Sequence, residues 1–160
     1  MDDKKAIVKM LLPVAALETM TPDAAQAVPQ CLLVGGYVPV RKYPFKIGRE
    51  SRVRTVRGKI ERIERPKMDD REPNNDLYLV DRGQLLNISR EHLQIEYEDD
   101  HFVLRDRGSA CGTRVNGEQV GGKDSGGVHV LADGDEIIIG IADSPYRFRF
   151  IDLSSFSLQE

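Results

Sequence analysis

Short runs of alternating apolar and polar residues fill most of the 160-residue chain. Such alternation places successive side chains on opposite faces of a β-strand, one of them against a core. The runs end at Gly, Pro, Asn or Asp, which favour turns. Many short strands separated by turns are typical of an all-β sandwich. The predicted strands, about eleven in number, span residues 31–36, 37–40, 43–47, 77–80, 93–97, 102–106, 113–115, 118–120, 128–131, 135–141 and 146–151.

Residues 1–30 do not follow this alternation, and we expect them to form a partly helical N-terminal appendix. Within it, Thr21-Pro22-Asp23 has the composition of a helix start, with a capping hydroxyl, a proline at the first helical position and an acid in the first turn. Pro29 should end this short helix. The sandwich is then expected to span residues 31–152, followed by a C-terminal tail at 153–160.

The stretch from Ala6 to Leu17 shares its apolar content with a secretory signal. Lys9 and Pro13 interrupt it, which is unusual for such a signal. We therefore expect a short packed segment. Because no run approaches the ~18 apolar residues of a membrane span, we expect no membrane contact.

Residues 50–73 break the strand pattern and form a basic insertion. Eight Lys or Arg and three Glu lie between Arg49 and Lys67. Apolar residues recur here at the spacing of one helix face, namely Val53, Val56, Ile60 and Ile63. A glycine between them disfavours a helix. A short helix and a mobile basic loop both remain open, and either would bring positive charge near a site for an anion.

The charge balance and the spacing of cysteine and histidine limit the kinds of partner and ligand to expect. The net charge is −3 with 31% charged residues, so the overall balance does not demand a nucleic-acid partner. Cys31 and Cys111 lie 80 positions apart, and the three histidines are scattered. These spacings do not match a metal site, and we expect neither a metal nor a cofactor. A reducing cytoplasm is the expected compartment.

Two polar clusters flank the hairpin predicted for residues 93–106. Ser89-Arg90-Glu91-His92 precedes its first strand, and Gly-Ser-Ala-Cys-Gly-Thr, residues 108–113, follows its second. A hairpin returns the chain to the edge from which it started, so both clusters should meet at one end of a sheet. Polar loops that converge on a rigid scaffold indicate a binding site.

A set of short motifs, in a fixed order, carries a family resemblance. They are Ile47-Gly48-Arg49, Ile88-Ser89-Arg90-Glu91-His92, Asp106-Arg107-Gly108-Ser109, Gly112-Thr113-Arg114-Val115-Asn116-Gly117, Leu131-Ala132-Asp133-Gly134-Asp135 and Ile139-Gly140. Over roughly residues 31–152, this order resembles the forkhead-associated (FHA) domain. The resemblance implies an eleven-stranded β-sandwich that binds phosphothreonine in partner proteins through loops at one end.

The residues at the matching positions suit a phosphate, which carries nearly two negative charges and three acceptor oxygens. The guanidinium of Arg49 can make two parallel charge-assisted bonds to it. Ser89 supplies a compact hydroxyl donor, and Arg90 adds a second cation. The resemblance implies that all three positions contact the phosphate.

The resemblance gives four other residues a supporting role. Gly48 should let the loop turn tightly so that Arg49 points outward. His92 should hold the binding loops by hydrogen bonding. Gly112 should supply a special backbone conformation, and Thr113 a local hydrogen bond.

The sequence departs from the family pattern just before Gly112. The family usually has Ser or Thr followed by Asn, whose side chains hold the phosphate and the peptide backbone, where this chain has Ala110 and Cys111. We expect Ser109, Ala110 and Cys111 to lie against a bound peptide. Losing one hydrogen bond to a charged group costs about 1.5–3 kcal/mol. Ser109, Arg107 and the basic insertion are candidates to compensate.

This departure leaves three consequences open: a weaker sequence preference, binding that does not depend on phosphate, and a redox-sensitive Cys111. The expected function is a non-catalytic phosphothreonine-binding adaptor downstream of a Ser/Thr protein kinase. The alternative is a phosphate-independent assembly scaffold. A Cys111–His92 hydrolase would lack an orienting third group, so we do not expect an enzyme. Residues 49–67 contain no aromatic residue to stack on bases, which argues against nucleic acid.

Overall fold

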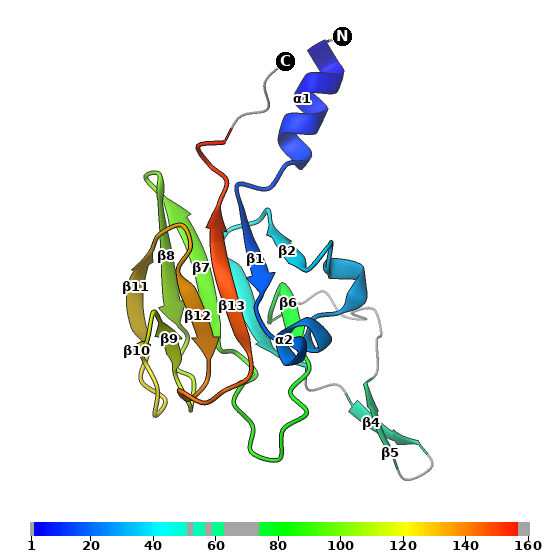
Figure 1. Cartoon of the computed structure of the whole chain (residues 1–160), viewed down its shortest axis with the longest axis vertical. Coiled ribbons are helices and arrows are strands. Elements are labelled where there is room, and N and C mark those ends of the chain that lie inside the picture. Colours follow the sequence, from blue (N-terminus) through cyan, green and yellow to red (C-terminus); the bar gives the residue numbers. More distant parts are fainter. Residues whose placement is uncertain (1, 51–52, 57–58, 63–73, 157–160) are drawn as a thin grey trace.

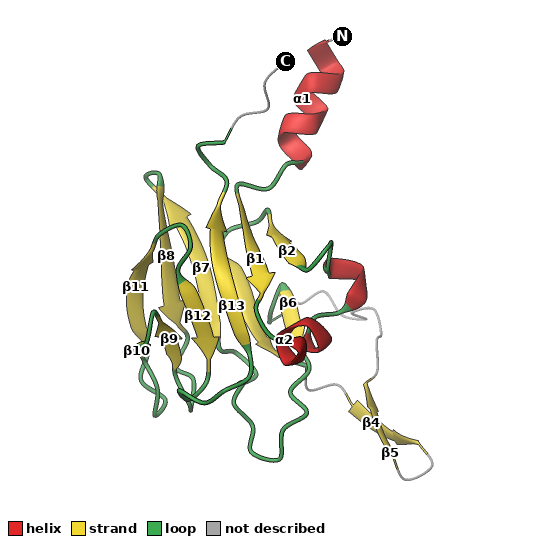
Figure 2. Ribbon diagram, in the orientation of Figure 1, coloured by secondary structure: helices red, strands yellow, loops and turns green. Residues whose placement is uncertain are grey.

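The computed structural model describes residues 2–50, 53–56, 59–62 and 74–156. Two sheets pack face to face and enclose one core (Figure 1, Figure 2). Neighbouring strands run antiparallel except for one parallel pair, β3 and β6. Within the described residues, the first sheet has the order β10 (Glu118–Val120), β9 (Thr113–Val115), β12 (Glu136–Ile139), β13 (Arg147–Asp152), β1 (Ala15–Thr19), β2 (Tyr37–Val40). The second has the order β11 (Gly127–Leu131), β8 (His101–Asp106), β7 (Leu93–Glu98), β3 (Phe45–Arg49), β6 (Leu77–Leu79).

These two sheets confirm the predicted all-β sandwich of about eleven strands. One strand differs from the prediction. Residues 31–36 do not form a strand: Gln30–Leu32 is a 3₁₀ turn, η1, followed by an isolated bridge between Val34 and Tyr37. The strand in its place is β1, which lies within the segment expected to be an appendix.

The strand β1 lies inside the first sheet, between β13 and β2. Ala15, Ala16 and Leu17 are all buried, because α2 (Pro22–Ala27) also contacts this strand. Burial of consecutive residues removes the alternation that identifies a half-exposed strand. Alanine also has a low preference for strands, which explains why the pattern missed β1.

The core is built from the inward-facing residues of both sheets. Phe148 and Phe150 of β13 and Leu93 and Ile95 of β7 are at most 1% exposed. Phe102 of β8 packs edge-on against Phe150 with ring centroids 4.9 Å apart, which joins the two sheets. This packing fixes the strand ends and therefore the loops that they carry.

The N-terminal segment contains two helices. Thr21 caps α2, as predicted, by accepting a hydrogen bond from the backbone N–H of Ala24 at 3.1 Å. The helix α1 (Asp2–Leu11) projects from the sandwich and leaves the apolar side chains of Ile7, Val8 and Met10 exposed (Figure 1). The prediction of a packed segment is therefore wrong for α1 and right for β1. In the part of the chain that is described, no helix reaches the length and apolar content of a membrane span.

The basic insertion contains a third, two-stranded sheet. The strands β4 (Val53–Val56) and β5 (Lys59–Arg62) pair antiparallel, so the helix considered for this segment is not formed. The remainder of the predicted insertion, residues 51–52, 57–58 and 63–73, lies outside the described residues, as do residues 157–160 of the predicted tail.

The two ends of the sandwich differ. The helix α1 and the end of β13 lie at one end, and the strands β4 and β5 and the loop between β6 and β7 lie at the other (Figure 1). This second end also carries the polar clusters.

Candidate functional site

Arg49 and Ser89 meet at this second end through their backbones. Arg49 is the last residue of β3, and Ser89 lies in the loop between β6 and β7. The N–H of Arg49 donates to the carbonyl oxygen of Ser89 at 2.9 Å. The end of a rigid strand therefore carries the loop that presents the serine hydroxyl.

Gly48 makes this approach sterically feasible. It lies within β3, not in a turn, and a Cβ there would come 2.0 Å from the carbonyl oxygen of Arg90 and 2.6 Å from Nδ2 of Asn75. Glycine is therefore required at position 48 for close packing, and not for the tight turn expected from the sequence.

Ser89 connects its own loop to the loop that follows β8. Its hydroxyl oxygen accepts a hydrogen bond from the backbone N–H of Ala110 at 3.1 Å, and its own N–H donates to Nδ1 of His92 at 3.0 Å. A hydroxyl that accepts one bond still has its proton to donate. The half-buried Ser89 can therefore donate to a ligand while it holds the loop that follows β8.

His92 is 0% exposed and links two loops. Its Nδ1 accepts from Ser89, and its Nε2 lies 2.8 Å from the carbonyl oxygen of Gly112. This arrangement requires the neutral tautomer that carries its proton on Nε2, because Nδ1 must accept. Burial disfavours the charged imidazolium and lowers the pKa of His92.

The carboxylate of Asp106 shapes the loop that follows β8. Its Oδ1 accepts from the N–H groups of Gly108 and Ser109, at 3.0 and 2.8 Å. Its Oδ2 accepts from the hydroxyls of Ser109 and Thr113, at 2.6 and 2.8 Å. Asp106 is 3% exposed and lies in the Asp106–Ser109 motif, but no side-chain pattern predicts that it shapes this loop.

Gly112 occupies a backbone conformation that suits glycine, with φ of +84°. Its N–H donates to the hydroxyl oxygen of Ser109 at 3.0 Å. Its carbonyl accepts from the N–H of Gly140 at 2.9 Å as well as facing His92. The loops before β9 and after β12 are therefore joined at this residue.

Ser109 corrects one expectation. It is 0% exposed, and its hydroxyl both donates to Asp106 and accepts from Gly112, so its side chain faces the interior and not a peptide. Ala110 is exposed and offers only its backbone near the site. The half-buried Cys111 has its Sγ 3.4 Å from the carbonyl oxygen of Leu86.

Asn75 was missed as a site residue. It is 2% exposed, its Nδ2 donates to the carbonyl oxygen of Arg90 at 2.7 Å, and its Oδ1 accepts from Nη1 of Arg107 at 2.7 Å. Nη2 of Arg107 also lies 3.4 Å from Oε1 of Glu91. Arg107 was a candidate to compensate for Ala110, but its guanidinium is held in this network. The only sequence signal at Asn75 is the run Asn74-Asn75-Asp76, which has the composition of a turn.

The cations differ in their surroundings. Arg90 has an exposed side chain, whereas Arg49 is half-buried. The Nε of Arg49 is buried without a hydrogen-bond partner among the described residues, a state shared there only by Nε of Arg114 in β9. Buried donors are nearly always paired, so these two nitrogens are exceptions among the described residues.

A Cys–His pair is not formed. Both ring nitrogens of His92 face other groups, namely the N–H of Ser89 and the carbonyl of Gly112. The thiol of Cys111 faces Leu86. The arrangement lacks the nucleophile–base contact that thiol catalysis needs.

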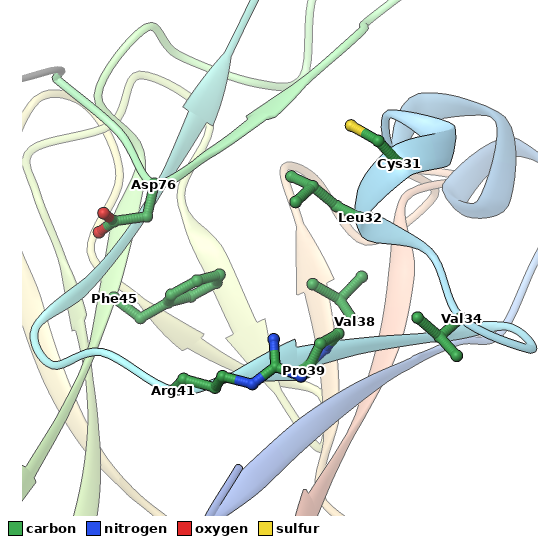
Figure 3. Close-up of a pocket in the computed structure, with 8 residues that line it drawn as sticks. All are labelled: Cys31, Leu32, Val34, Val38, Pro39, Arg41, Phe45 and Asp76. Carbon is green, nitrogen blue, oxygen red and sulfur yellow. The ribbon is translucent and has the colours of Figure 1, made fainter. Parts of the chain in front are cut away.

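A separate pocket of about 140 Å³ lies beside β2 (Figure 3). Its charged lining consists of one cation and one carboxylate, Arg41 and Asp76, with apolar side chains between them. It lacks an excess of positive charge and contains none of the predicted phosphate-binding residues. Its lining residues are Cys31, Leu32, Val34, Val38, Pro39, Arg41, Phe45 and Asp76.

Comparison with known sequences identifies the domain. A family model for the FHA domain matches residues 45–140. The glycogen accumulation regulator GarA of Mycobacterium tuberculosis is 38% identical over 84 residues, which are 52% of this chain and 42% of that protein. An uncharacterized protein of Mycobacterium bovis, Mb1858, has the same identity and coverage. The match thus spans less than half the length of these curated relatives.

Solved structures agree on the fold. The FHA domain of an Arabidopsis thaliana hypothetical protein matches with a TM-score of 0.52 at 21% identity, over 92% of each chain. Mycobacterium tuberculosis EmbR in complex with a low-affinity phosphopeptide matches with a TM-score of 0.51 at 19% identity, over 98% of this chain and 31% of that one. Because the family model covers more than half of the sequence and the sandwich matches FHA domains, the chain belongs to the FHA domain family.

Proposed function

We propose that this chain binds a phosphothreonine segment of a partner protein, with Arg49, Ser89 and Arg90 as the phosphate-binding residues. The observation that carries the proposal is the junction of Arg49 and Ser89, whose backbones are hydrogen-bonded at 2.9 Å. The guanidinium of Arg49 and the hydroxyl of Ser89 are therefore carried by two backbone segments that are in direct contact.

The chemistry of the site favours a doubly charged ester over a neutral ligand. Arg49 and Arg90 supply two positive charges, and the proton of Ser89 is available to an oxygen acceptor. The guanidinium of the half-buried Arg49 can make charge-assisted bonds to such an ester. Among relatives, the N-terminal FHA domain of Saccharomyces cerevisiae Rad53p has been solved in complex with a phosphothreonine peptide.

We propose the role of a non-catalytic adaptor that acts downstream of a Ser/Thr protein kinase, with a phosphothreonine protein as partner. FHA domains are binding modules, and the engagement of His92 with two backbone groups is consistent with this. Cys31 and Cys111 are both free thiols, which supports a reducing cytoplasm as the proposed compartment.

The test is a titration of the full chain with an oriented phosphothreonine peptide library, with phosphoserine and unmodified peptides as controls. The proposal expects binding to phosphothreonine peptides at least about tenfold tighter than to their unmodified counterparts. Equal affinity for the phosphorylated and unmodified peptides would contradict it.

A second candidate is a phosphate-independent assembly scaffold. Two features of the loop between β8 and β9 favour it: the hydroxyl of Ser109 is buried, and position 110 is an alanine. This loop therefore has no side-chain hydroxyl at its surface. The same titration separates the two, because a scaffold would bind its partner equally with and without phosphate.

A further inference from the structure

The strand β11 forms one outer edge of the second sheet (Figure 1). It pairs with β8 on one side, in a register that places Gly127 opposite Asp106 and Leu131 opposite Phe102. Among the described strands, none is hydrogen-bonded to its other side. An unpaired strand edge is a template on which another strand can add.

Two residues of β11 direct their backbone groups toward this free edge. The N–H of Arg107 donates to the carbonyl of His92, and the groups of successive residues along β8 point to opposite sides. This alternation directs the backbone of His129 toward β8 and that of Val128 and Val130 outward. Within the described residues, these outward groups have one contact, from Nδ1 of His129 to the carbonyl oxygen of Val130 at 2.6 Å. A carbonyl oxygen has two lone pairs and can accept a further bond.

The other three edges of the two sheets are protected against such addition. The described strands β6 and β10 have only three residues each, and β2 contains Pro39, which has no N–H to donate. Short strands, prolines and charged side chains are the usual devices that prevent edge pairing. The strand β11 has five residues, Gly127–Leu131, and contains neither a proline nor a Lys, Arg, Asp or Glu.

The outer face of the second sheet is apolar beside this edge. Val128 and Val130 are 53% and 62% exposed, and Val103 of β8 lies directly opposite Val130 in the register. The neighbouring charges are paired with each other, since Nε of Arg105 lies 2.8 Å from Oε2 of Glu96. A strand added to β11 would therefore cover apolar side chains without separating an ion pair.

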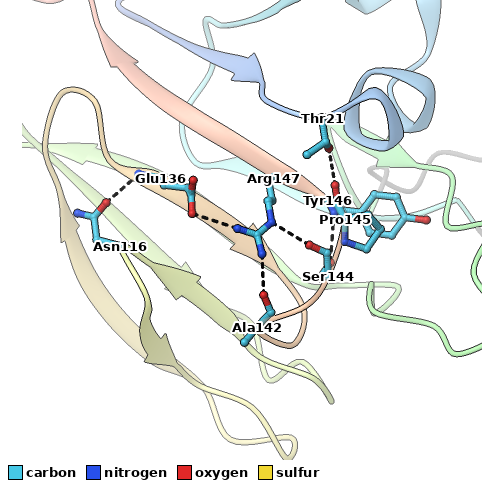
Figure 4. Close-up of polar contacts among 8 residues, drawn as sticks. All are labelled: Thr21, Asn116, Glu136, Ala142, Ser144, Pro145, Tyr146 and Arg147. Atoms are coloured by element: carbon cyan, nitrogen blue, oxygen red, sulfur yellow. Dashed lines mark hydrogen bonds and ion pairs between the residues drawn. The ribbon is translucent and has the colours of Figure 1, made fainter.

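The outer face of the first sheet is different, because its polar groups are bonded within the chain (Figure 4). Nη1 of Arg147 lies 3.5 Å from Oε1 of Glu136. The same guanidinium donates to the carbonyls of Ala142 and Ser144, at 2.8 and 3.2 Å. The N–H of Glu136 donates to Oδ1 of Asn116 at 2.9 Å. This face lacks the combination of free backbone groups and exposed apolar side chains that β11 presents.

The sequence of β11 is complementary to itself. Val128 and Val130 flank His129 symmetrically, so a twofold antiparallel pairing centred on His129 places Val128 of one copy opposite Val130 of the other. The outward groups then meet, and each of the two valine pairs exchanges two backbone hydrogen bonds. The opposed valines also pack on the outer face, where such β-branched pairs stabilise a sheet.

We propose that β11 is a self-association edge, at which a second copy of this chain pairs antiparallel and joins the two second sheets into one. The symmetric order of the strand favours a second copy over an unrelated strand. Because β11 begins opposite Asp106, at the end that carries the candidate site, the two sites of the dimer face in opposite directions and both stay open. The inference is independent of the proposed function.

The first experiment measures the oligomeric state of the full wild-type chain by sedimentation equilibrium, together with amide exchange by NMR. A contact through one strand is smaller than a standard interface, so we expect a weak dimer with a Kd below about 1 mM. The outward amides of Val128 and Val130 should exchange with water about twofold or more slowly at about 1 mM than at about 10 μM, because the partner strand protects them. This readout does not depend on any variant.

The second experiment uses two double variants, V128K/V130K and V128E/V130E. Each places like charges opposite one another in the proposed pairing and should stay monomeric. An equimolar mixture should dimerise, because lysines then oppose glutamates. The matched control is V34K/Y37K, at two residues beside the β2 edge that are 66% and 43% exposed, and it should dimerise like the wild type. Thermal denaturation checks that each variant is folded.

Three results would overturn the inference: a wild type that is monomeric at about 1 mM, a wild-type dimer without protection of both amides, and folded double variants whose mixture does not dimerise. A dimer in either β11 variant alone would also overturn it. Association that is lost in each variant and restored in the mixture would support it.

Discussion

The backbone N–H of Arg49 donates to the carbonyl oxygen of Ser89 at 2.9 Å, so the end of β3 and the loop before β7 form one unit. The backbone bond leaves the guanidinium and the hydroxyl available for a ligand. The N–H of Ala110 adds a third segment to the same unit through the Ser89 hydroxyl. The proposed binding end is therefore assembled by contacts that do not depend on a ligand, which would lower the cost of ordering on binding.

Ser89→Ala should weaken phosphothreonine binding about tenfold to hundredfold, because a hydroxyl bond to a charged group contributes about 1.5–3 kcal/mol. It should also lower the free energy of unfolding by about 0.5–1.5 kcal/mol, since the N–H of Ala110 loses its acceptor. Calorimetric titration and urea denaturation measure the two effects. The control is Ser155→Ala, an exposed serine that follows β13, which should change neither. Unchanged affinity in Ser89→Ala would remove the hydroxyl from the proposed contact.

Cys111→Asn should raise the affinity for a phosphothreonine peptide, by up to about tenfold. The amide can both donate and accept, whereas a thiol does each weakly. Fluorescence anisotropy with one labelled peptide compares the variant with the wild type, and Cys31→Asn, at an exposed cysteine outside the site, serves as the control. A lower affinity in Cys111→Asn would mean that the thiol itself favours the bound state.

Gly48→Ala should destabilise the fold by about 1–3 kcal/mol, because the new Cβ would meet the carbonyl of Arg90 at 2.0 Å. Displacing Arg90 should also reduce phosphopeptide affinity. Gly134→Ala is the comparison: it has a φ of +85° but nothing within 4 Å of its Cβ, so it should lose stability and keep affinity. Thermal denaturation and titration together separate steric displacement from backbone strain.

The stability of the fold should fall below neutral pH through His92. Burial lowers its folded pKa below the unfolded value of 6.5, so the unfolded chain binds the proton more readily. The contribution of His92 to the free energy of unfolding is complete above pH 6.5. It is lost as the pH falls below this value, by at most about 1.4 kcal/mol per pH unit. Denaturation at several pH values should show this slope in the wild type and in His101→Gln, but not in His92→Gln. An unchanged slope in His92→Gln would assign it to another group.

The alternation of apolar and polar residues was sufficient to locate strands that have only one face toward the core. The hairpin of β7 and β8 was located within a residue at each end, because Leu93 and Ile95 alternate with polar residues. The pattern failed for β1, where three consecutive buried residues leave no alternation. It also failed for η1, where apolar residues follow Pro29 without entering a sheet.

The site was predictable only in part. The resemblance brought forward Arg49, Ser89 and His92, and the structure joins Ser89 to both of the others by hydrogen bonds. Asn75 could not be found in this way, because a polar residue in a turn gives no sign that it contacts Gly48 and Arg90 across the sheet end. The role of Asp106 likewise depends on backbone N–H groups that no side-chain pattern reveals.

The most direct test of the account is the titration of wild type and Arg49→Ala with one phosphothreonine peptide and its unmodified form. Arg105→Ala is the matched control, because this exposed arginine pairs with Glu96 at 2.8 Å on the outer face of the second sheet. The account predicts phosphate-dependent binding in the wild type and in Arg105→Ala, and a loss of at least about tenfold in a folded Arg49→Ala. Full retention of phosphopeptide affinity by Arg49→Ala would contradict it.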